Sequence, residues 1–163
     1  MKVYTIKKGD HSPFRLPAFT TSDVCEFEVM FDNSAIYTTK DPVNQYDINK
    51  LFGLSDGLNH DYNSARFGWN YIPDTADHQI KIYSYCYING ERIYKKLWNL
   101  ELNIWYRLTI ELNKDTYDFF IDGELFNIEM TNGSRKGGNL KYKLFPYFGG
   151  DEVAPHDIKI YFK

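Results

Sequence analysis

The chain has little cysteine, with two in 163 residues, and it has no apolar run long enough to cross a membrane. Both Cys25 and Cys86 fall on the apolar phase of alternating segments, which favours buried free thiols over a disulfide or a nucleophile. The N-terminus alternates as a strand does and lacks the apolar block of a secretory signal. We therefore expect a soluble protein, made in the cytoplasm, with no membrane partner.

Positive charge is not in surplus either. The 19 lysines and arginines face 22 acidic residues, which gives a net charge of -3 and a pI near 5.8. Binding to nucleic acid requires an excess of cations to neutralise phosphates, so we expect no nucleic-acid partner. No linker or internal repeat divides the sequence, and its length suits one substantial core. Residues 1–163 are therefore interpreted as a single domain.

Helical periodicity is nearly absent, and period-two alternation of apolar and polar residues dominates. This alternation predicts strands at Val24–Phe31, Ala65–Ile72, Ile104–Asn113, Thr116–Ile121, Glu124–Met130, Leu140–Phe148 and Ile158–Phe162. Ser34–Thr39 is a candidate partner for the first strand, and residues 41–63 are predicted to form a long polar loop with one short helical turn. About ten strands separated by turns are typical of a two-sheet antiparallel β-sandwich, so the fold class is all-β.

The strongest local signal is Asn89-Gly90, because a two-residue Asn-Gly loop between alternating segments is typical of a tight hairpin. If Ile88 faces Glu91, the other pairs follow by counting outward along both strands. One face then pairs Tyr87 with Arg92, Tyr85 with Tyr94, Tyr83 with Lys96 and Lys81 with Trp98. The opposite face pairs Cys86 with Ile93 and Ile82 with Leu97, and it is the predicted core side.

The aromatic and basic face of this hairpin is the candidate ligand-binding surface, and Trp69 is predicted to join it. Its residues are Tyr83, Tyr85, Tyr87, Arg92, Tyr94, Lys96, Trp98 and Trp69. Aromatic rings offer flat apolar faces to sugars, while the cations can bond hydroxyls or carboxylates. Tyrosine, tryptophan and arginine are also enriched in protein interfaces, and the same face could be a second side of the core. The residues leave these three interpretations open.

Two segments carry a family resemblance. Residues 103–123 contain a Trp105-Tyr106 strand, a short turn, a second strand and an Asp122-Gly123 hairpin, in which Phe119 pairs with Phe126 and Tyr117 with Ile128. Residues 144–160 place a Gly-Gly turn before the last strand. Both segments resemble the concanavalin A-like lectin and glucanase superfamily, in particular its laminin-G-like jelly rolls. The resemblance implies a two-sheet jelly-roll sandwich whose last strand lies beside the first.

This superfamily includes lectins, glycan-degrading enzymes, adhesion modules and virion proteins, so the resemblance alone does not choose a function. We expect a non-catalytic recognition or assembly module that binds a glycan or decorates a phage virion, with a glycan, a protein or further copies of the chain as its partner. The alternative is a small glycoside hydrolase or polysaccharide lyase. Glu26 and Glu28 have same-face spacing, but the family's Glu-x-Asp-x-x-Glu pattern is missing. No catalytic residue is therefore assigned.

Metal ligands are sparse in the sequence. The four histidines do not follow a zinc spacing. Asp56, Asn59, Asp61 and Asn63 alternate like the oxygen ligands of calcium in lectin relatives, although the same residue types are ordinary turn formers. Calcium at this segment is the one candidate cofactor, and no other cofactor is expected.

Overall fold

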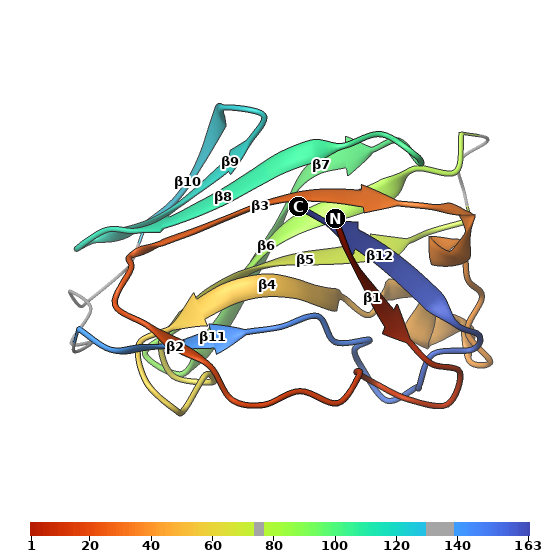
Figure 1. Cartoon of the computed structure of the whole chain (residues 1–163), viewed down its shortest axis with the longest axis horizontal. Coiled ribbons are helices and arrows are strands. Elements are labelled where there is room, and N and C mark those ends of the chain that lie inside the picture. Colours follow the sequence, from red (N-terminus) through yellow and green to blue (C-terminus); the bar gives the residue numbers. More distant parts are fainter. Residues whose placement is uncertain (74–76, 130–138) are drawn as a thin grey trace.

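A computed structural model describes residues 1–73, 77–129 and 139–163 as two packed six-stranded sheets (Figure 1). Sheet A contains, in spatial order, β1 (Lys2–Ile6), β12 (Ile158–Phe162), β3 (Val24–Phe31), β8 (Tyr106–Leu112), β9 (Thr116–Ile121) and β10 (Glu124–Glu129). Sheet B contains β2 (Phe19–Thr20), β11 (Lys141–Leu144), β4 (Asn49–Ser55), β5 (Ser64–Tyr71), β6 (Ile80–Ile88) and β7 (Glu91–Leu100). All the strand pairs are antiparallel, so the expected all-β sandwich is confirmed.

Two short 3-10 helices, η1 (Asn33–Ala35) and η2 (Pro42–Tyr46), connect β3 to β4. Asp32 and Asp41 cap them, since their side chains accept backbone N–H bonds from Ser34 and Val43. The segment 34–39, expected to be a hairpin partner of β3, forms no strand, and β8 takes the place beside β3 instead. No described helix has the length and apolar character that crossing a bilayer would need.

The core lies between the sheets and is rich in aromatic rings. Phe67 from β5 meets Phe119 from β9 edge to face at 5.0 Å between ring centroids. Trp69 is 0% exposed and packs on Phe31 at 5.0 Å. Its predicted place on the hairpin's aromatic face is therefore wrong, because β5 directs its apolar phase, which includes Trp69, into the core.

The Asn89-Gly90 hairpin has the predicted register over most of its length. Ile88 faces Glu91, Tyr87 faces Arg92, Tyr85 faces Tyr94 and Tyr83 faces Lys96, and both turn residues have positive φ. The register then shifts between Ile82 and Tyr83, so that Ile82 faces Trp98 and Lys81 faces Asn99. The predicted pairs of Ile82 with Leu97 and Lys81 with Trp98 are wrong, since a bulge adds one residue to β7.

The largest error in the predicted set of strands concerns β4. Residues 49–55 lie inside the predicted polar loop, yet they form a strand of sheet B between β11 and β5. Only η2 in that segment matches the expected helical turn. The second hairpin has its predicted register, with Phe119 facing Phe126 and Tyr117 facing Ile128, while Met130 lies outside the described residues. The last strand, β12, pairs with β1, as the resemblance implied (Figure 1).

Candidate functional site

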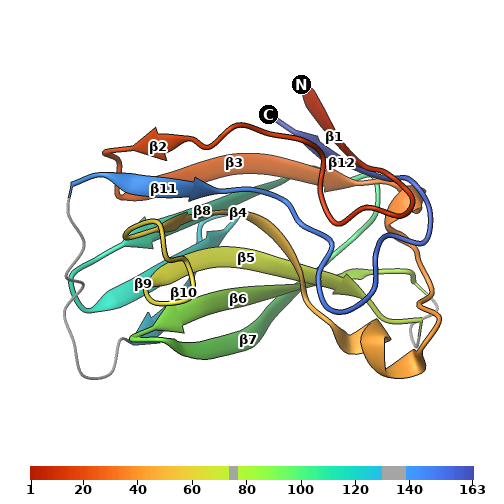
Figure 2. The ribbon, with the colours of Figure 1, turned by 90° about the horizontal axis from the view of Figure 1, so that it is seen from below.

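The candidate site lies on the outer face of sheet B, the face that Figure 2 shows toward the viewer. Alternation along β5 turns Trp69 inward and Arg66 outward, and β6 turns Tyr85 and Tyr87 outward beside Arg66. A cavity of about 420 Å³ opens here. The lining residues that matter for its chemistry are Arg15, Lys50, Arg66, Tyr85, Tyr87 and Tyr147.

A second, smaller cavity of about 120 Å³ adjoins the first on the same face. Asp47, Arg92 and Tyr94 contribute to its lining. Lys50 and Tyr85 line both cavities. We call these two adjoining spaces the groove, and Lys50 and Tyr85 stand at the junction of its two compartments.

Arg66 is the most unusual group in the groove because it is a buried cation. It is only 9% exposed, and its Nε atom has no hydrogen-bond partner among the described residues. Its guanidinium lies 5.7 Å from the ring centroid of Tyr85. Burial lowers the pKa of Arg66, which opposes the charge that the side chain carries.

Two glycines keep the sheet open around Arg66. Gly53 faces Arg66 across the β4–β5 ladder, and a Cβ atom at position 53 would lie 2.3 Å from the Cβ of Arg66. Gly68 lies beside Ile48, and a Cβ atom there would meet the Ile48 Cγ2 at 2.3 Å. Neither position can carry a side chain without displacing its neighbours. The absence of side chains at these two glycines leaves space for the groove beside Arg66.

Lys50 reaches the junction from β4. Reciprocal backbone bonds with Tyr147, of 2.8 and 3.0 Å, fix the strand at this residue. The Lys50 ammonium lies 4.9 Å from the ring centroid of Tyr85, and a Cβ added at Gly149 would come within 2.5 Å of the Nζ atom. Burial, reinforced by the positive charge of Arg66, lowers the pKa of Lys50 to about 8.

The tyrosines of β6 link the cations. Tyr85 is 6% exposed, and its ring lies 6.1 Å from that of Tyr87. A side-chain hydrogen bond with Tyr85 raises the pKa of Arg92, so Arg92 stays charged. Burial and the neighbouring Tyr85 raise the pKa of Tyr87, which keeps this hydroxyl protonated as a hydrogen-bond donor.

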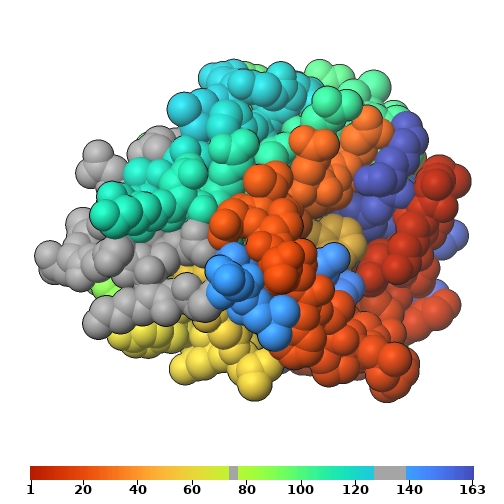
Figure 3. Space-filling view, turned by 60° about the vertical axis from the view of Figure 1, so that its left-hand side comes forward, coloured from red at the N-terminus to blue at the C-terminus, as the bar shows by residue number. Residues whose placement is uncertain are grey.

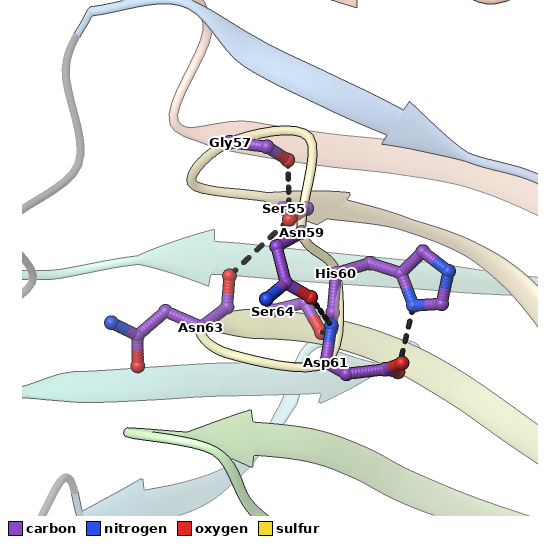
Figure 4. A network of polar contacts seen from close by, with 7 residues as sticks. All are labelled: Ser55, Gly57, Asn59, His60, Asp61, Asn63 and Ser64. Carbon is purple, nitrogen blue, oxygen red and sulfur yellow. Dashed lines mark hydrogen bonds and ion pairs between the residues drawn. The ribbon is translucent and has the colours of Figure 1, made fainter.

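The loop between β4 and β5 contributes His60 and Asp61 to the lining of the larger cavity. Figure 4 shows the polar contacts within this loop. Its polar side chains are mostly engaged in the loop itself. Asn59 accepts the Asp61 backbone N–H at 3.1 Å, and the Asn63 side chain accepts the backbone N–H of Asn89 at 2.8 Å. The His60 Nδ1 atom lies 2.9 Å from an Asp61 carboxylate oxygen. These contacts give the loop a well-defined turn structure.

Calcium at Asp56, Asn59, Asp61 and Asn63 stays an untested prediction. Among the described residues, no three His, Cys, Asp or Glu side chains are gathered to hold a metal. The side chains of Asn59 and Asn63 accept hydrogen bonds, and the Asp61 carboxylate lies against His60.

The structure brings together about half of the predicted binding surface. Tyr85, Tyr87, Arg92 and Tyr94 line the groove. Tyr83 and Lys96 lie opposite one another on the same face but line neither compartment, and the Tyr83 hydroxyl donates to Asn70 at 3.2 Å.

The predicted place of Trp98 on this surface is wrong. The bulge in β7 turns Trp98 to the other face of sheet B, where it stays 42% exposed. There its ring packs on Phe126 of sheet A at 6.2 Å. Trp98 and the buried Trp69 are thus both absent from the groove.

Sequence reasoning missed several residues of the groove, and those that matter most for its chemistry are Arg15, Lys50, Arg66 and Tyr147. Arg66 could have been found, because a strand with Trp69 on its core face must present Arg66 on the other face. Lys50 was hidden in a strand whose alternation is broken by a bulge between Lys50 and Gly53. Arg15 and Tyr147 come from segments whose position depends on the whole fold.

Comparisons with known proteins identify the fold. No family model and no curated protein matches the chain. The alginate lyase AlyC3 superposes with a TM-score of 0.66 at 12% identity, over 98% of this chain and 71% of that one. A Bacteroides ovatus mixed-linkage glucan GH16 protein gives 0.59 at 9% identity, over 98% and 77%. The PL7 alginate lyase AlyA1 from Zobellia galactanivorans gives 0.56 at 13% identity, over 99% and 62%. The expected concanavalin A-like jelly-roll fold is confirmed.

Proposed function

We propose that this chain binds an acidic polysaccharide, one that carries carboxylates, along the groove on the outer face of sheet B. The observation that carries the proposal is the buried Arg66, whose Nε atom has no partner among the described residues. A buried polar group without a partner costs about 1–3 kcal/mol, and more when it is charged. A ligand carboxylate in the groove would give this buried cation a counter-ion, and bonds between a guanidinium and a carboxylate are stronger than those between neutral groups.

The charge of the groove supports an anionic ligand. Arg15, Lys50, Arg66 and Arg92 face only Asp47 and Asp61 in the linings of the two compartments. Lys50 is pushed toward the neutral form by burial and by its cationic neighbours. An anion in the groove would relieve this repulsion, and it would raise the pKa of Lys50 again.

The shape of the groove supports a polymer. Two compartments that meet at Lys50 and Tyr85 suit two successive sugar units, with their linkage at the junction. The rings of Tyr85, Tyr87 and Tyr94 add flat apolar surface of the kind that sugar C–H groups contact. The alginate lyase AlyC3, similar in fold, has been solved in complex with dimannuronate. The role in a phage virion stays a prediction that no observation here tests.

A second candidate function is cleavage of the same polymer by β-elimination. The observation that favours it is the position of Lys50, whose pKa is lowered to about 8, beside Tyr85 at the junction. With the sugar carboxylate held by Arg66, the neutral Lys50 amine would take the adjacent carbon-bound proton. The C–H electron pair would form a C=C bond, the glycosidic C–O bond would break, and the Tyr85 hydroxyl would protonate the leaving oxygen. No water would be consumed.

Glycoside hydrolysis has no comparable support. Glu26 and Glu28 lie on β3 of sheet A, where Glu26 accepts a bond from Thr109 and Glu28 approaches Arg107 and Lys163. A cavity that these two glutamates line lies outside the groove on sheet B. Hydrolysis of a glycosidic bond requires two carboxylates on either side of one sugar. The groove has one aspartate in each compartment, Asp47 and Asp61, and its other polar groups are mainly cations and tyrosines.

The binding proposal is tested by titrating the chain calorimetrically with alginate, polygalacturonate and a neutral β-glucan. We expect binding to at least one polyuronate and none to the neutral glucan. Arg66→Met should weaken binding at least about thirty-fold, because it removes one partner of a buried charge pair. Arg107→Met, which removes an arginine from sheet A, is the matched control. Equal affinity for neutral and acidic glycans, or unchanged binding in Arg66→Met, would refute the proposal.

The cleavage proposal has its own measurement, the ultraviolet absorbance of the C=C bond formed in the product. Turnover should rise as the pH passes above about 8, because the bound carboxylate raises the pKa of Lys50 from its value of about 8 in the free protein. Lys50→Met and Tyr85→Phe should each abolish turnover, and Tyr85→Phe should leave much of the binding. Binding without any absorbance change on any polyuronate would leave recognition alone as the function.

A further inference from the structure

A further cavity, separate from the groove and of about 450 Å³, lies between the two sheets. It opens where β3 of sheet A lies across from β4 and β11 of sheet B. In Figure 3 the yellow-orange surface of β4 is visible at the bottom of this hollow, between the orange β3 and the light-blue β11. The groove lies on the outside of sheet B, so the two spaces face different directions, although Phe145 contributes to the wall of both.

The wall of this cleft is aromatic. Phe52 lies at its centre and contacts Tyr4, Phe27 and Phe145 edge to face, with ring centroids 5.5, 5.3 and 5.7 Å apart. The half-buried Cys25 adds an apolar thiol, because burial raises its pKa to about 12 and keeps it neutral. An apolar ligand would therefore meet packing surface on several sides.

The mouth of the cleft carries cations at positions that alternation turns inward. Tyr142 and Leu144 of β11 line the groove on the outer face, so Lys141 and Lys143 point the other way. Lys141 is ion-paired with Asp23 at 2.9 Å. Lys143 lines the cleft beside Cys25 and forms no ion pair with a described residue.

Lys2 stands at the same mouth, with its ammonium 4.8 Å from the ring centroid of Tyr4. Glu26 is the carboxylate in the lining of this cleft, and one of its oxygens accepts a bond from Thr109 at 3.1 Å on sheet A. The cleft thus has an aromatic interior and a mouth that carries net positive charge. This combination is complementary to a molecule with an apolar tail and a negative head.

We propose that this cleft binds an amphipathic monocarboxylate of the fatty-acid class, with its tail against Phe27, Phe52 and Phe145 and its carboxylate at Lys143 and Lys2. The volume of the cleft lies within the roughly 300–1,000 Å³ that small-ligand sites occupy. Neither lysine lines the groove, so the proposed head-group position is separate from the polysaccharide site, while the ring of Phe145 is common to the two walls. The cleft would let one sandwich recognise two unrelated ligands.

The test is calorimetry on the full chain with hexanoate, octanoate and decanoate. Each added CH₂ should tighten binding about threefold to fourfold, the increment expected for burying a methylene. Octanol, which has the same tail without the charge, should bind more weakly than octanoate. Affinity that does not change with tail length, or no saturable binding of any of the three acids, would overturn the proposal.

Substitutions of single lysines test where the ligand carboxylate binds. Lys143→Met should weaken octanoate about tenfold, because it removes a charge-assisted contact, and should leave octanol binding unchanged. Lys114→Met, in the turn between β8 and β9, is the matched control and should change neither affinity. Equal losses in both variants would show a general charge effect and would overturn the assignment to this cleft. Polysaccharide binding measured in parallel reports that Lys143→Met is folded.

Discussion

The outer faces of the two sheets invite comparison, because both are rich in charge and both contain a cavity. The cavity on sheet A is the larger, at about 520 Å³, against about 420 Å³ for the main compartment on sheet B. On sheet A, Glu28 lies 3.8 Å from Arg107 and 3.4 Å from Lys163, and the Arg107 backbone N–H bonds Asp122 at 2.7 Å. On sheet B, Arg66 is buried and its Nε has no partner among the described residues.

The two faces differ in how their charges are held more than in the size of their cavities. Charges that are exposed and paired with each other contribute about 0–1 kcal/mol and need no ligand. A buried cation with an unpaired N–H group is costly for the free protein, and such a cost is typical of sites where ligand binding offsets it. The groove on sheet B is therefore the better functional candidate.

We expect the greatest loss of polyuronate affinity when an aromatic ring is removed from the outer face of sheet B, and no loss when one is removed from sheet A. Tyr85→Ala should weaken polyuronate binding by about 2 kcal/mol or more, because Tyr85 lines both compartments and supports Lys50 and Arg66. Phe120→Ala removes a ring from the cavity on sheet A and should leave affinity unchanged. Titration calorimetry of both variants makes the comparison. A larger loss from Phe120→Ala would transfer the site to sheet A.

The next effect is the pH dependence of binding. Below a pH of about 8 Lys50 is protonated and attracts an anion, and as the pH rises through this value the charge is lost. Affinity should therefore fall about threefold to tenfold between about pH 7 and pH 9.5, corresponding to the loss of about 1 kcal/mol of attraction. Lys50→Arg should bind equally at both pH values. If it loses affinity as the original chain does, another group is responsible.

Removing the charge of Arg66 should raise the stability of the free protein, although it should weaken ligand binding. Arg66→Met replaces a buried cation by an apolar side chain of similar length and should stabilise the free protein by about 1–2 kcal/mol. Arg107→Met on sheet A should change the free energy of unfolding by less than about 0.5 kcal/mol. Urea denaturation followed by near-ultraviolet circular dichroism measures both. A destabilised Arg66→Met would mean that the guanidinium supports the fold.

The smallest effect concerns Glu28. Removing its charge in Glu28→Gln should lower stability by less than about 0.5 kcal/mol and leave polyuronate affinity unchanged, because the pairs with Arg107 and Lys163 are exposed. The urea midpoint and one binding isotherm are sufficient to measure both quantities. A clear drop in affinity would give sheet A a role in recognition.

Local patterns predicted the strands whose alternation is intact and the hairpins whose turns are Asn-Gly or Asp-Gly. The register of Tyr85 against Tyr94 followed from two turn residues alone. Prediction failed where a bulge interrupts the period of two, as it does in β4 and at Trp98 of β7, since one extra residue exchanges the faces of all that follow.

The candidate site was predicted only in the part that one hairpin supplies. Its tyrosines and Arg92 are close in sequence, so counting along the strands was sufficient to bring them together. Lys50 and Arg66 come from two further strands, and which strands are neighbours in a sheet depends on long-range packing. Trp69 and Trp98 were both predicted to contact a ligand. In the structure, Trp69 is buried in the core and Trp98 packs on Phe126 at the edge of the sandwich.

The bond between Asn49 and Gly149 has a consequence for when the site appears during synthesis. The Asn49 side chain accepts the Gly149 backbone N–H at 2.8 Å and donates to the Tyr37 hydroxyl at 3.0 Å, directly beside Lys50. A ribosome would therefore have to release the chain past residue 149 before Lys50 could be locked in place. The tyrosine hairpin can form earlier, so a nascent chain would present the rings of the groove before it presents the fixed cation.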